Sequence, residues 1–255
     1  MNNLNRIDKD NPGLDDLDGI NENWQDIEEA IDKLETGYRY VQTLYFAAND
    51  TFEKATYPWL QAVRVKVQGG GGSGGGVAIT ESGRSACGGG GGGGGYAEKF
   101  ITVATLLESE SVTVGAGGDA PTAGANNGNV GGTSSFGAHL SATGGNGGNG
   151  MTSSINGMEI GGAGGTGSGG DLHVDGQRGG VGRVGSGLTL NAAGGGNSKL
   201  GMGGTQAQSV NGAHGQSGQN YGGGGGGALN RDSSGTTARA GGAGAPGIVI
   251  VELYA

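Results

Sequence analysis

The stretch 62-AVRVKVQGGGGSGGG-76 joins the two kinds of segment that make up most of this chain. In its first half, Val63, Val65 and Val67 alternate with Arg64 and Lys66, which predicts a β-strand with one buried face. Its second half is glycine with one serine, so it has no side chains from which to build a core. The fold therefore depends on how the glycine runs are ordered.

Glycine runs recur from residue 69 to the end of the chain, whereas residues 1–67 contain only Gly13, Gly19 and Gly37. Glycine fills 66 of the 255 positions, several times its usual share. The proline content is low and no strict Gly-X-Y repeat is present, which excludes collagen. The runs lie within residues 69–76, 88–95, 115–118, 144–150, 161–170, 176–187, 194–196, 222–227 and 241–247.

Two interpretations of these runs remain open. Glycine loses the most backbone entropy on ordering, so the runs could be flexible linkers. Alternatively they form polyglycine II, an extended threefold helix rising about 3.1 Å per residue, whose backbone groups bond to neighbouring helices. The recurrence of the runs favours an ordered bundle. So do the apolar residues between them and the strand expected at the end of the chain, residues 247–254.

Charge and composition argue against several classes of function. The formal net charge is −9 with only 14 Lys and Arg, which disfavours nucleic acid as a partner. No apolar window is long enough for a membrane helix, and residues 1–10 lack the apolar segment of a secretory signal. The single cysteine, Cys87, cannot form an intrachain disulfide, and we expect it to be a buried, inert thiol.

No constellation of catalytic or metal-binding residues stands out. In so glycine-rich a chain, matches to G-x-G-x-x-G carry no weight, and no run is followed by the Lys-Ser or Lys-Thr of a P-loop. His139, His173 and His214 lack metal-ligand spacing. The nearest candidate is Asp171-Leu-His173-Val-Asp175, for which a solvated strand face is the favoured interpretation. We therefore expect no catalytic residue, metal or cofactor, and a protein that is not an enzyme.

A heptad-like apolar stripe precedes the glycine runs, with spacings of three and four residues. It predicts a helix over residues 19–36 that is too short to be stable alone, so we expect it to self-associate as a coiled coil. In the alternative, the stripe folds back onto its own domain. The residues of the stripe are Leu17, Ile20, Trp24, Ile27, Ile31 and Leu34.

The expected fold is mostly β and irregular, with a polyglycine II-type domain behind a short coiled-coil helix. We divide the chain into an N-terminal anchor and coiled coil (1–37), a β-rich connector with the first strands (38–68), and a glycine-rich domain with a terminal strand (69–255).

The order of these elements resembles the glycine-rich domain of bacteriophage tail-fibre and tail-tip proteins over residues 55–255. The matching elements are 62–76, 88–99, 112–118, Ser134-Ser-Phe-Gly137 and 245–252, and residues 19–28 are similar to helical segments of tail fibres. The resemblance implies a homotrimer in the virion tail that is assembled in the host cytoplasm. It also implies that the N-terminal segment binds other tail or baseplate proteins. A bacterial surface receptor (a glycan, an outer-membrane protein or a pilus) would be the second partner.

Loops between the runs are the expected receptor contacts, because they can vary while the frame stays constant. For Phe136 and Tyr221, packing at the end of the bundle is an equal alternative. Two other functions remain open: a purely structural tail component, such as a spacer or tip closure, and an ice-binding or cell-wall protein. The contact candidates are Phe136, His139, Leu140, Met151, Ile155 and Tyr221.

Overall fold

A computed structural model describes residues 24–25, 27–28, 37–185, 189–208, 211–232 and 236–255. The chain divides into two units, residues 1–39 and residues 40–255. The helix expected over residues 19–36 lies outside the described residues except for Trp24, Gln25, Ile27 and Glu28, so the coiled coil and the homotrimer stay predictions. The rest of the description concerns residues 40–255, to which the expected connector contributes its first three strands.

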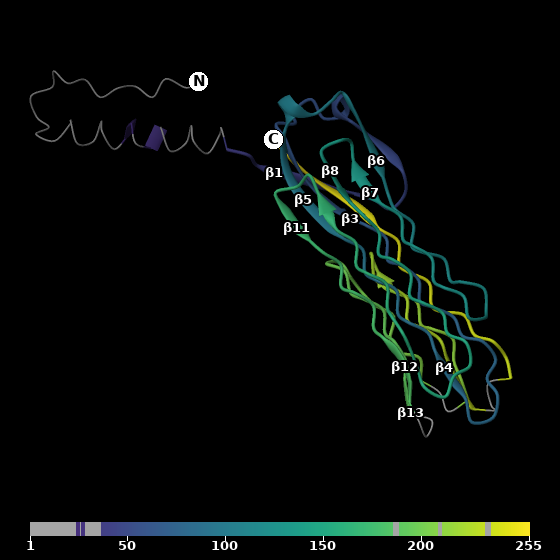
Figure 1. Cartoon of the computed structure of the whole chain (residues 1–255). Helices are drawn as coiled ribbons and strands as arrows, with labels where there is room; N and C mark the ends of the chain where they lie inside the picture. Colours follow the sequence, from purple (N-terminus) through teal and green to yellow (C-terminus); the bar gives the residue numbers. More distant parts are fainter. Residues whose placement is uncertain (1–23, 26, 29–36, 186–188, 209–210, 233–235) are drawn as a thin grey trace, which may run out of the picture. The chain divides into compact units, whose positions relative to one another are not determined.

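One end of this unit is a sandwich of two antiparallel sheets (Figure 1). The first sheet has the order β1 (Tyr40–Phe46), β17 (Ile248–Tyr254), β3 (Ala62–Gln68), β5 (Tyr96–Thr102) and β11 (Leu172–Val174). The second has the order β10 (Gly167–Ser168), β8 (Leu140–Ala142), β7 (Ser134–Phe136), β6 (Ser109–Thr113) and β2 (Asp50–Glu53). Two 3₁₀ turns, Lys54–Thr56 and Val103–Thr105, belong to the connections between strands.

The core of the sandwich follows from the alternation in its strands. Val63, Val65 and Val67 of β3 are fully buried, whereas Arg64 on the same strand is exposed, as the sequence predicts. Side chains of the second sheet pack on them, including Phe52, Phe136 and Leu140. The closing strand β17 is the central partner of β1 and β3, so the expectation of a paired strand at the end of the chain is confirmed.

The opposite end carries short strands around a second, smaller core (Figure 1). β4 (Ser85–Cys87) pairs with β16 (Leu229–Arg231), and β12 (Gly182–Gly185) pairs with β9 (Gly157–Glu159) and β13 (Thr189–Asn191). A separate pair, β14 (Gly201–Met202) with β15 (Gln219–Asn220), joins two turns at the sandwich end of the bundle, where Gly222 N–H donates to Pro246 O.

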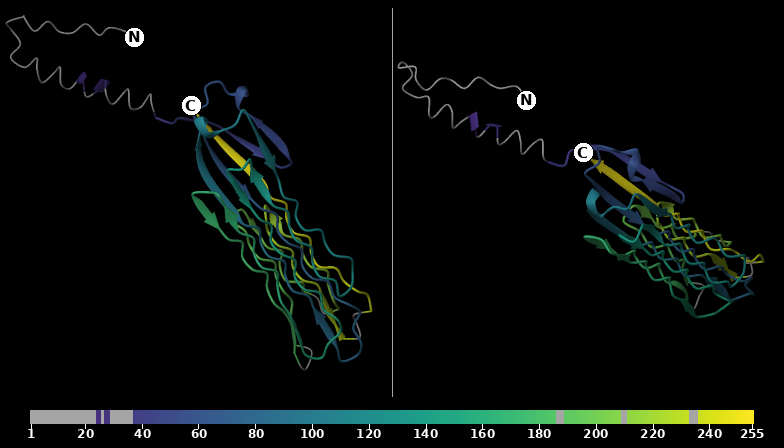
Figure 2. Two further views of the ribbon diagram at one scale, coloured as in Figure 1. Left: turned by 45° about the horizontal axis from the view of Figure 1, so that its top comes forward. Right: turned by 90° about the horizontal axis from the view of Figure 1, so that it is seen from above.

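Glycine runs connect the two ends and lie side by side as a bundle (Figures 1 and 2). Along run 69–77, residues three apart donate their N–H groups to the same neighbouring run, over distances of 2.8 to 3.0 Å. Gly69, Gly72 and Gly75 bond to run 88–95; Gly70, Ser73 and Gly76 bond to run 126–132; Gly71, Gly74 and Val77 bond to run 239–245. A three-residue period with outward hydrogen bonds is the pattern expected of polyglycine II.

Each of three inner runs is surrounded by other runs. Run 69–76 donates to three neighbours and accepts from three more, namely 143–151, 222–228 and the run that contains Gly118. Runs 88–95 and 222–228 are likewise bonded to runs on all sides, and both are bonded to run 69–76. The backbone hydrogen bonds therefore arrange the described runs as a hexagonally packed bundle. The first layer holds runs 126–132, 143–150 and 160–166, and the second holds runs 115–118, 69–76, 88–95 and 176–180. The third layer holds runs 239–247, 222–228 and 193–197, and the fourth holds runs 214–218 and 203–207.

The sandwich sets the register of the bundle because strands continue directly into runs. In the β3–β5 pair, Gln68 lies opposite Tyr96, and the next residue, Gly69, donates to Gly95. Likewise Ile248 of β17 lies opposite Gln68, and Gly71 donates to Ala245 farther along the same antiparallel pair. The side chain of Gln68 is fully buried at this junction and donates to the carbonyl oxygens of Gly94 and Gly95 at 3.0 and 2.8 Å.

Candidate receptor-binding surface

The inner runs can carry almost no side chains because the runs approach too closely. A Cβ atom added to Gly91 would lie within 3.0 Å of the carbonyl oxygens of both Gly72 and Ser73, closer than real Cβ atoms come. Runs 69–76, 88–95 and 222–228 are buried throughout, and their only residues other than glycine are Ser73 and Ala228. Within the bundle, side chains available for binding must therefore come from the outer runs and the turns.

Two of the outer runs carry their side chains at every third residue. In Thr143-Gly-Gly-Asn146-Gly-Gly-Asn149, the threonine and the first asparagine are exposed, whereas Gly145 and Gly148 face inward and are buried. In Ile160-Gly-Gly-Ala163-Gly-Gly-Thr166, all three side chains are exposed. A threefold helix turns every third residue to the same side, so these side chains form outward rows.

The turns farthest from the sandwich form the surface that we call the far end, made of segments 77–87, 151–159, 182–185, 189–191 and 229–232. Backbone hydrogen bonds join its first two segments: Ala78 N–H donates to Met151 O at 3.1 Å, and Ser85 and Ser154 exchange two bonds of 2.9 Å. Asp232 joins the first segment to the last, since its Oδ1 accepts from Gly83 N–H at 2.6 Å. Asp232 has a φ of 50°, a left-handed conformation that is uncommon outside glycine.

Large apolar side chains are exposed at the far end. Ile79, Ile155 and Met158 expose more than half of their surface, although they belong to segments held by hydrogen bonds. Charged groups lie in the same segments, including Glu81, which pairs with Arg84 at 3.6 Å. Contiguous patches of exposed apolar side chains rimmed by polar ones are typical of protein-binding surfaces.

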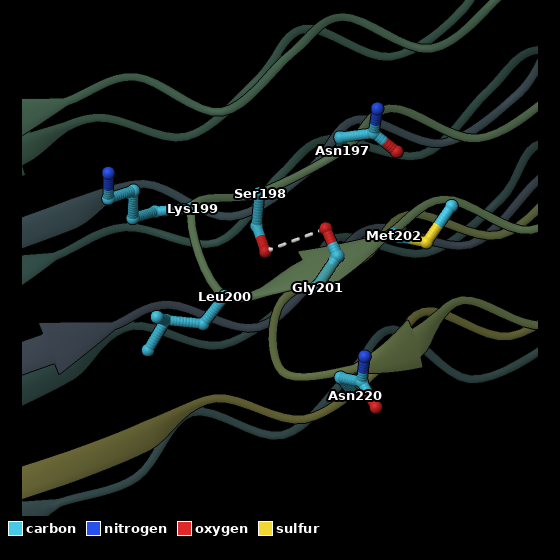
Figure 3. A pocket seen from close by; sticks show the side chains of 7 residues that line it. All are labelled: Asn197, Ser198, Lys199, Leu200, Gly201, Met202 and Asn220. Atoms are coloured by element: carbon cyan, nitrogen blue, oxygen red, sulfur yellow. Dashed lines mark hydrogen bonds between the residues drawn. The ribbon is translucent and has the colours of Figure 1, made fainter.

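A hollow of about 340 Å³ lies where the turns 198–202 and 219–221 meet (Figure 3). Ser198 holds these turns together: its Oγ donates to Tyr221 O at 2.6 Å and to Gly201 O at 3.3 Å. Asn197 Oδ1 accepts from Gly203 N–H at 2.8 Å, and Asn220 is left-handed with a φ of 58°. The remaining lining residues, Lys199, Leu200 and Met202, add one cation and two apolar side chains. This combination of amides and an ammonium group could hydrogen-bond a polar ligand.

Three of the expected receptor contacts are buried, so those predictions are wrong. Phe136 and Leu140 lie in the core of the sandwich with 0% and 3% exposed, and Met151 lies in the far-end core with 3% exposed. Phe136 packs against Phe52 with ring centroids 5.7 Å apart, so packing is its role. A buried side chain cannot touch a receptor without unfolding its core.

The other three candidates lie in different places. His139 sits in the sandwich, where its Nε2 is 2.8 Å from Oε1 of the buried Glu110. Ile155 is exposed at the far end, and Tyr221 is exposed beside the hollow. The structure therefore does not bring the six candidates together as one site.

Sequence reasoning missed Ile79 and the residues of segment 197–202 that line the hollow. No local pattern marks them, because their neighbours come from other turns that only the packing of the runs brings close. The Gly-Gly-X period of runs 143–150 and 160–166 was a signal that could have identified outer runs.

Cys87, Asp171 and His173 are titratable residues that the sequence singled out. Cys87 is buried, as expected, and burial raises the pKa of its thiol to about 11. In the exposed segment 171–175, Asp171 accepts from Phe100 N–H at 3.0 Å and His173 accepts from Gly170 N–H at 3.0 Å.

The described residues contain no group of three or more His, Cys, Asp or Glu side chains that could hold a metal ion. They also contain no helix of sufficient length and apolarity to span a bilayer.

These features define a glycine-rich structural domain, in which a β-sandwich continues into a bundle of polyglycine-type runs. Residues 47–254 match the glycine-rich domain family, and the chain belongs to that family. No curated protein matches the chain.

Proposed function

We propose that this protein is a bacteriophage tail-fibre or tail-tip component that attaches to a receptor on the bacterial surface. In this proposal the chain forms a homotrimer through the stripe in residues 17–34 and binds other tail proteins through its N-terminal segment. The bundle separates the binding turns from the sandwich.

One observation carries the proposal: the bundle separates the point where the chain enters from a surface of irregular turns. The chain enters the domain at β1, in the sandwich, and the far end lies at the other end of the runs (Figure 1). The runs between them are held in place because the backbone of every inner run is hydrogen-bonded to neighbouring runs on all sides. A rigid frame with exposed side chains on its outermost turns suits recognition, because the turns can change without altering the frame.

The exposed Ile79, Ile155 and Met158 favour a protein receptor over a glycan at the far end. Apolar side chains contribute most when a partner covers them, whereas glycans present mainly hydroxyl groups. The hollow beside Tyr221, with its amide groups, is the alternative contact region within the same proposal.

A cell-adsorption assay tests the proposal. Fluorescently labelled full-length protein is mixed with a panel of bacterial strains, including hosts of a phage that carries it, and infection is scored in its presence. We expect adsorption to sensitive strains and protection from infection. The far-end variant Ile79→Asp/Ile155→Asp should lose adsorption, and Ala163→Asp, which changes an exposed residue in the middle of an outer run, should retain it.

Two results would speak against specific receptor binding, and a third would relocate the contact. Absence of adsorption to every sensitive strain would leave the purely structural tail component as the better explanation. Adsorption lost equally in Ala163→Asp would indicate a charge effect without a specific surface. Adsorption that survives the far-end variant but is lost in Asn220→Ala would move the contact to the hollow.

A further inference from the structure

The free edge of β1 is unlike the other edges of the sandwich. β1 is the outermost strand of its sheet, and no described strand lies on its other side. Alternate N–H and C=O groups of such a strand point away from the sheet and can bond to another strand. Its sequence, 40-YVQTLYF-46, has no charged residue, proline or glycine, and Tyr45 is 70% exposed.

The other three edge strands of the sandwich are protected. β10 has two residues and β11 has three, too few to pair extensively. β2 is longer, but both of its ends are acidic, Asp50 and Glu53. Short strands and charged residues are the usual means by which proteins prevent unwanted strand pairing. β1 has seven residues and neither form of protection, which indicates that its edge is normally covered.

The position of β1 in the chain identifies what covers it. The apolar stripe ends at Leu34, and β1 begins at Tyr40, six positions later. Six residues span at most about 20 Å even when fully extended. Copies of this chain that associate through the stripe are therefore tethered to one another by short segments that lead directly into β1.

We infer that the free edge of β1, with the exposed side chains of Tyr40, Val41 and Tyr45, is a contact between copies of this chain. The partner is a second copy, which supplies strand-edge hydrogen bonds and covers the exposed aromatic rings. Tyrosine is enriched at the centres of protein interfaces, where it contributes both apolar area and a polar end. This inference rests on the self-association in the proposed function but not on receptor binding.

The test measures mass and amide hydrogen exchange on the full-length chain. Three proteins are compared: the wild type, the stripe variant Ile27→Asn/Ile31→Asn, and the edge variant Val41→Lys/Tyr45→Lys. Leu172→Lys is the matched control, because it places a lysine at an exposed position on the opposite edge strand, β11. We expect the wild type to assemble and its β1 amides to exchange at least about tenfold more slowly than in the stripe variant.

The edge variant should dissociate at a concentration at least about tenfold higher than the wild type, which corresponds to about 1.4 kcal/mol. Leu172→Lys should behave like the wild type. A monomeric wild type would overturn the inference together with the proposed self-association. An assembled wild type whose β1 amides exchange as fast as those of the stripe variant would overturn the inference alone. Equal dissociation of the edge and control variants would do the same.

Discussion

Replacing Gly91 by alanine tests whether the bundle is held by close backbone packing. Gly91 lies in the middle of inner run 88–95, where its N–H donates to Gly225 O at 2.8 Å and its carbonyl accepts from Gly196 N–H at 2.8 Å. The new methyl group would meet the carbonyl oxygens of Gly72 and Ser73 within 3.0 Å, with no flexible side chain available to move aside. The runs 69–76 and 88–95 must therefore separate.

The cost follows from the hydrogen bonds that this separation would stretch. The nearest bond between the two runs, Gly72 N–H to Gly92 O at 2.9 Å, and one bond to a further neighbour are the first affected. A buried hydrogen bond left unsatisfied costs about 1–3 kcal/mol, so two such bonds give a loss of about 2–6 kcal/mol. For a domain of this size, that loss corresponds to a fall in Tm of about 5–20 °C.

Gly194→Ala provides the matched control for this experiment. It is also a glycine in a run, but the nearest atom to an added Cβ is the carbonyl oxygen of Gly204 at 3.5 Å, an ordinary contact. This variant should be unchanged or slightly more stable, since alanine restricts the unfolded chain. Thermal and urea unfolding followed by circular dichroism measure both variants. Equal stability of Gly91→Ala and Gly194→Ala would refute the argument from close packing.

Four further predictions concern other parts of the domain. Gln68→Leu should lower the free energy of unfolding by about 1–3 kcal/mol in urea titration, because it removes the donor to the carbonyls of Gly94 and Gly95. Asn146→Ala, at an outward position of an outer run, should change it by less than about 0.5 kcal/mol in the same assay. Cys87 should not react with an aromatic disulfide reagent at pH 8 until the protein is unfolded, since burial raises the pKa of its thiol to about 11; rapid reaction in the folded state would contradict its burial. Stability should fall as pH rises from about 9 to 11, because the unfolded chain loses the Cys87 proton first, and Cys87→Ala should weaken this fall when unfolding is measured across that range.

Local pattern was sufficient to predict the strands of the sandwich. The alternation of valines with Arg64 and Lys66 placed β3 correctly, and the apolar segment 247–254 indicated a paired terminal strand, which is β17. Strand propensity and alternation depend on neighbouring residues, so they can be read from one segment at a time. The short strands of the far end, such as β9 and β12, have no such alternation because glycine interrupts them.

The candidate site was less predictable, for a physical reason that Phe136 illustrates. An aromatic residue between glycine runs can be a surface contact or a core residue, and its sequence context is the same in both cases. Phe136 is buried because β7 pairs with β6 and β8, and its ring reaches Phe52 from the distant strand β2. Ile79 is exposed for the opposite reason: no other segment of the described chain covers it sufficiently.

The sequence by itself determined that the chain combines β-strands with glycine runs, and that these runs could be ordered only through their own backbones. It could not determine which runs are neighbours, because glycines are chemically identical and a run has no side chains that would distinguish one neighbouring run from another. The tertiary structure decided this through the strands at the ends of the runs: pairing of β3 with β5 and β17 places runs 69–76, 88–95 and 239–247 side by side. Specific side chains in the sandwich therefore select the register, and the glycine backbones propagate it along the bundle.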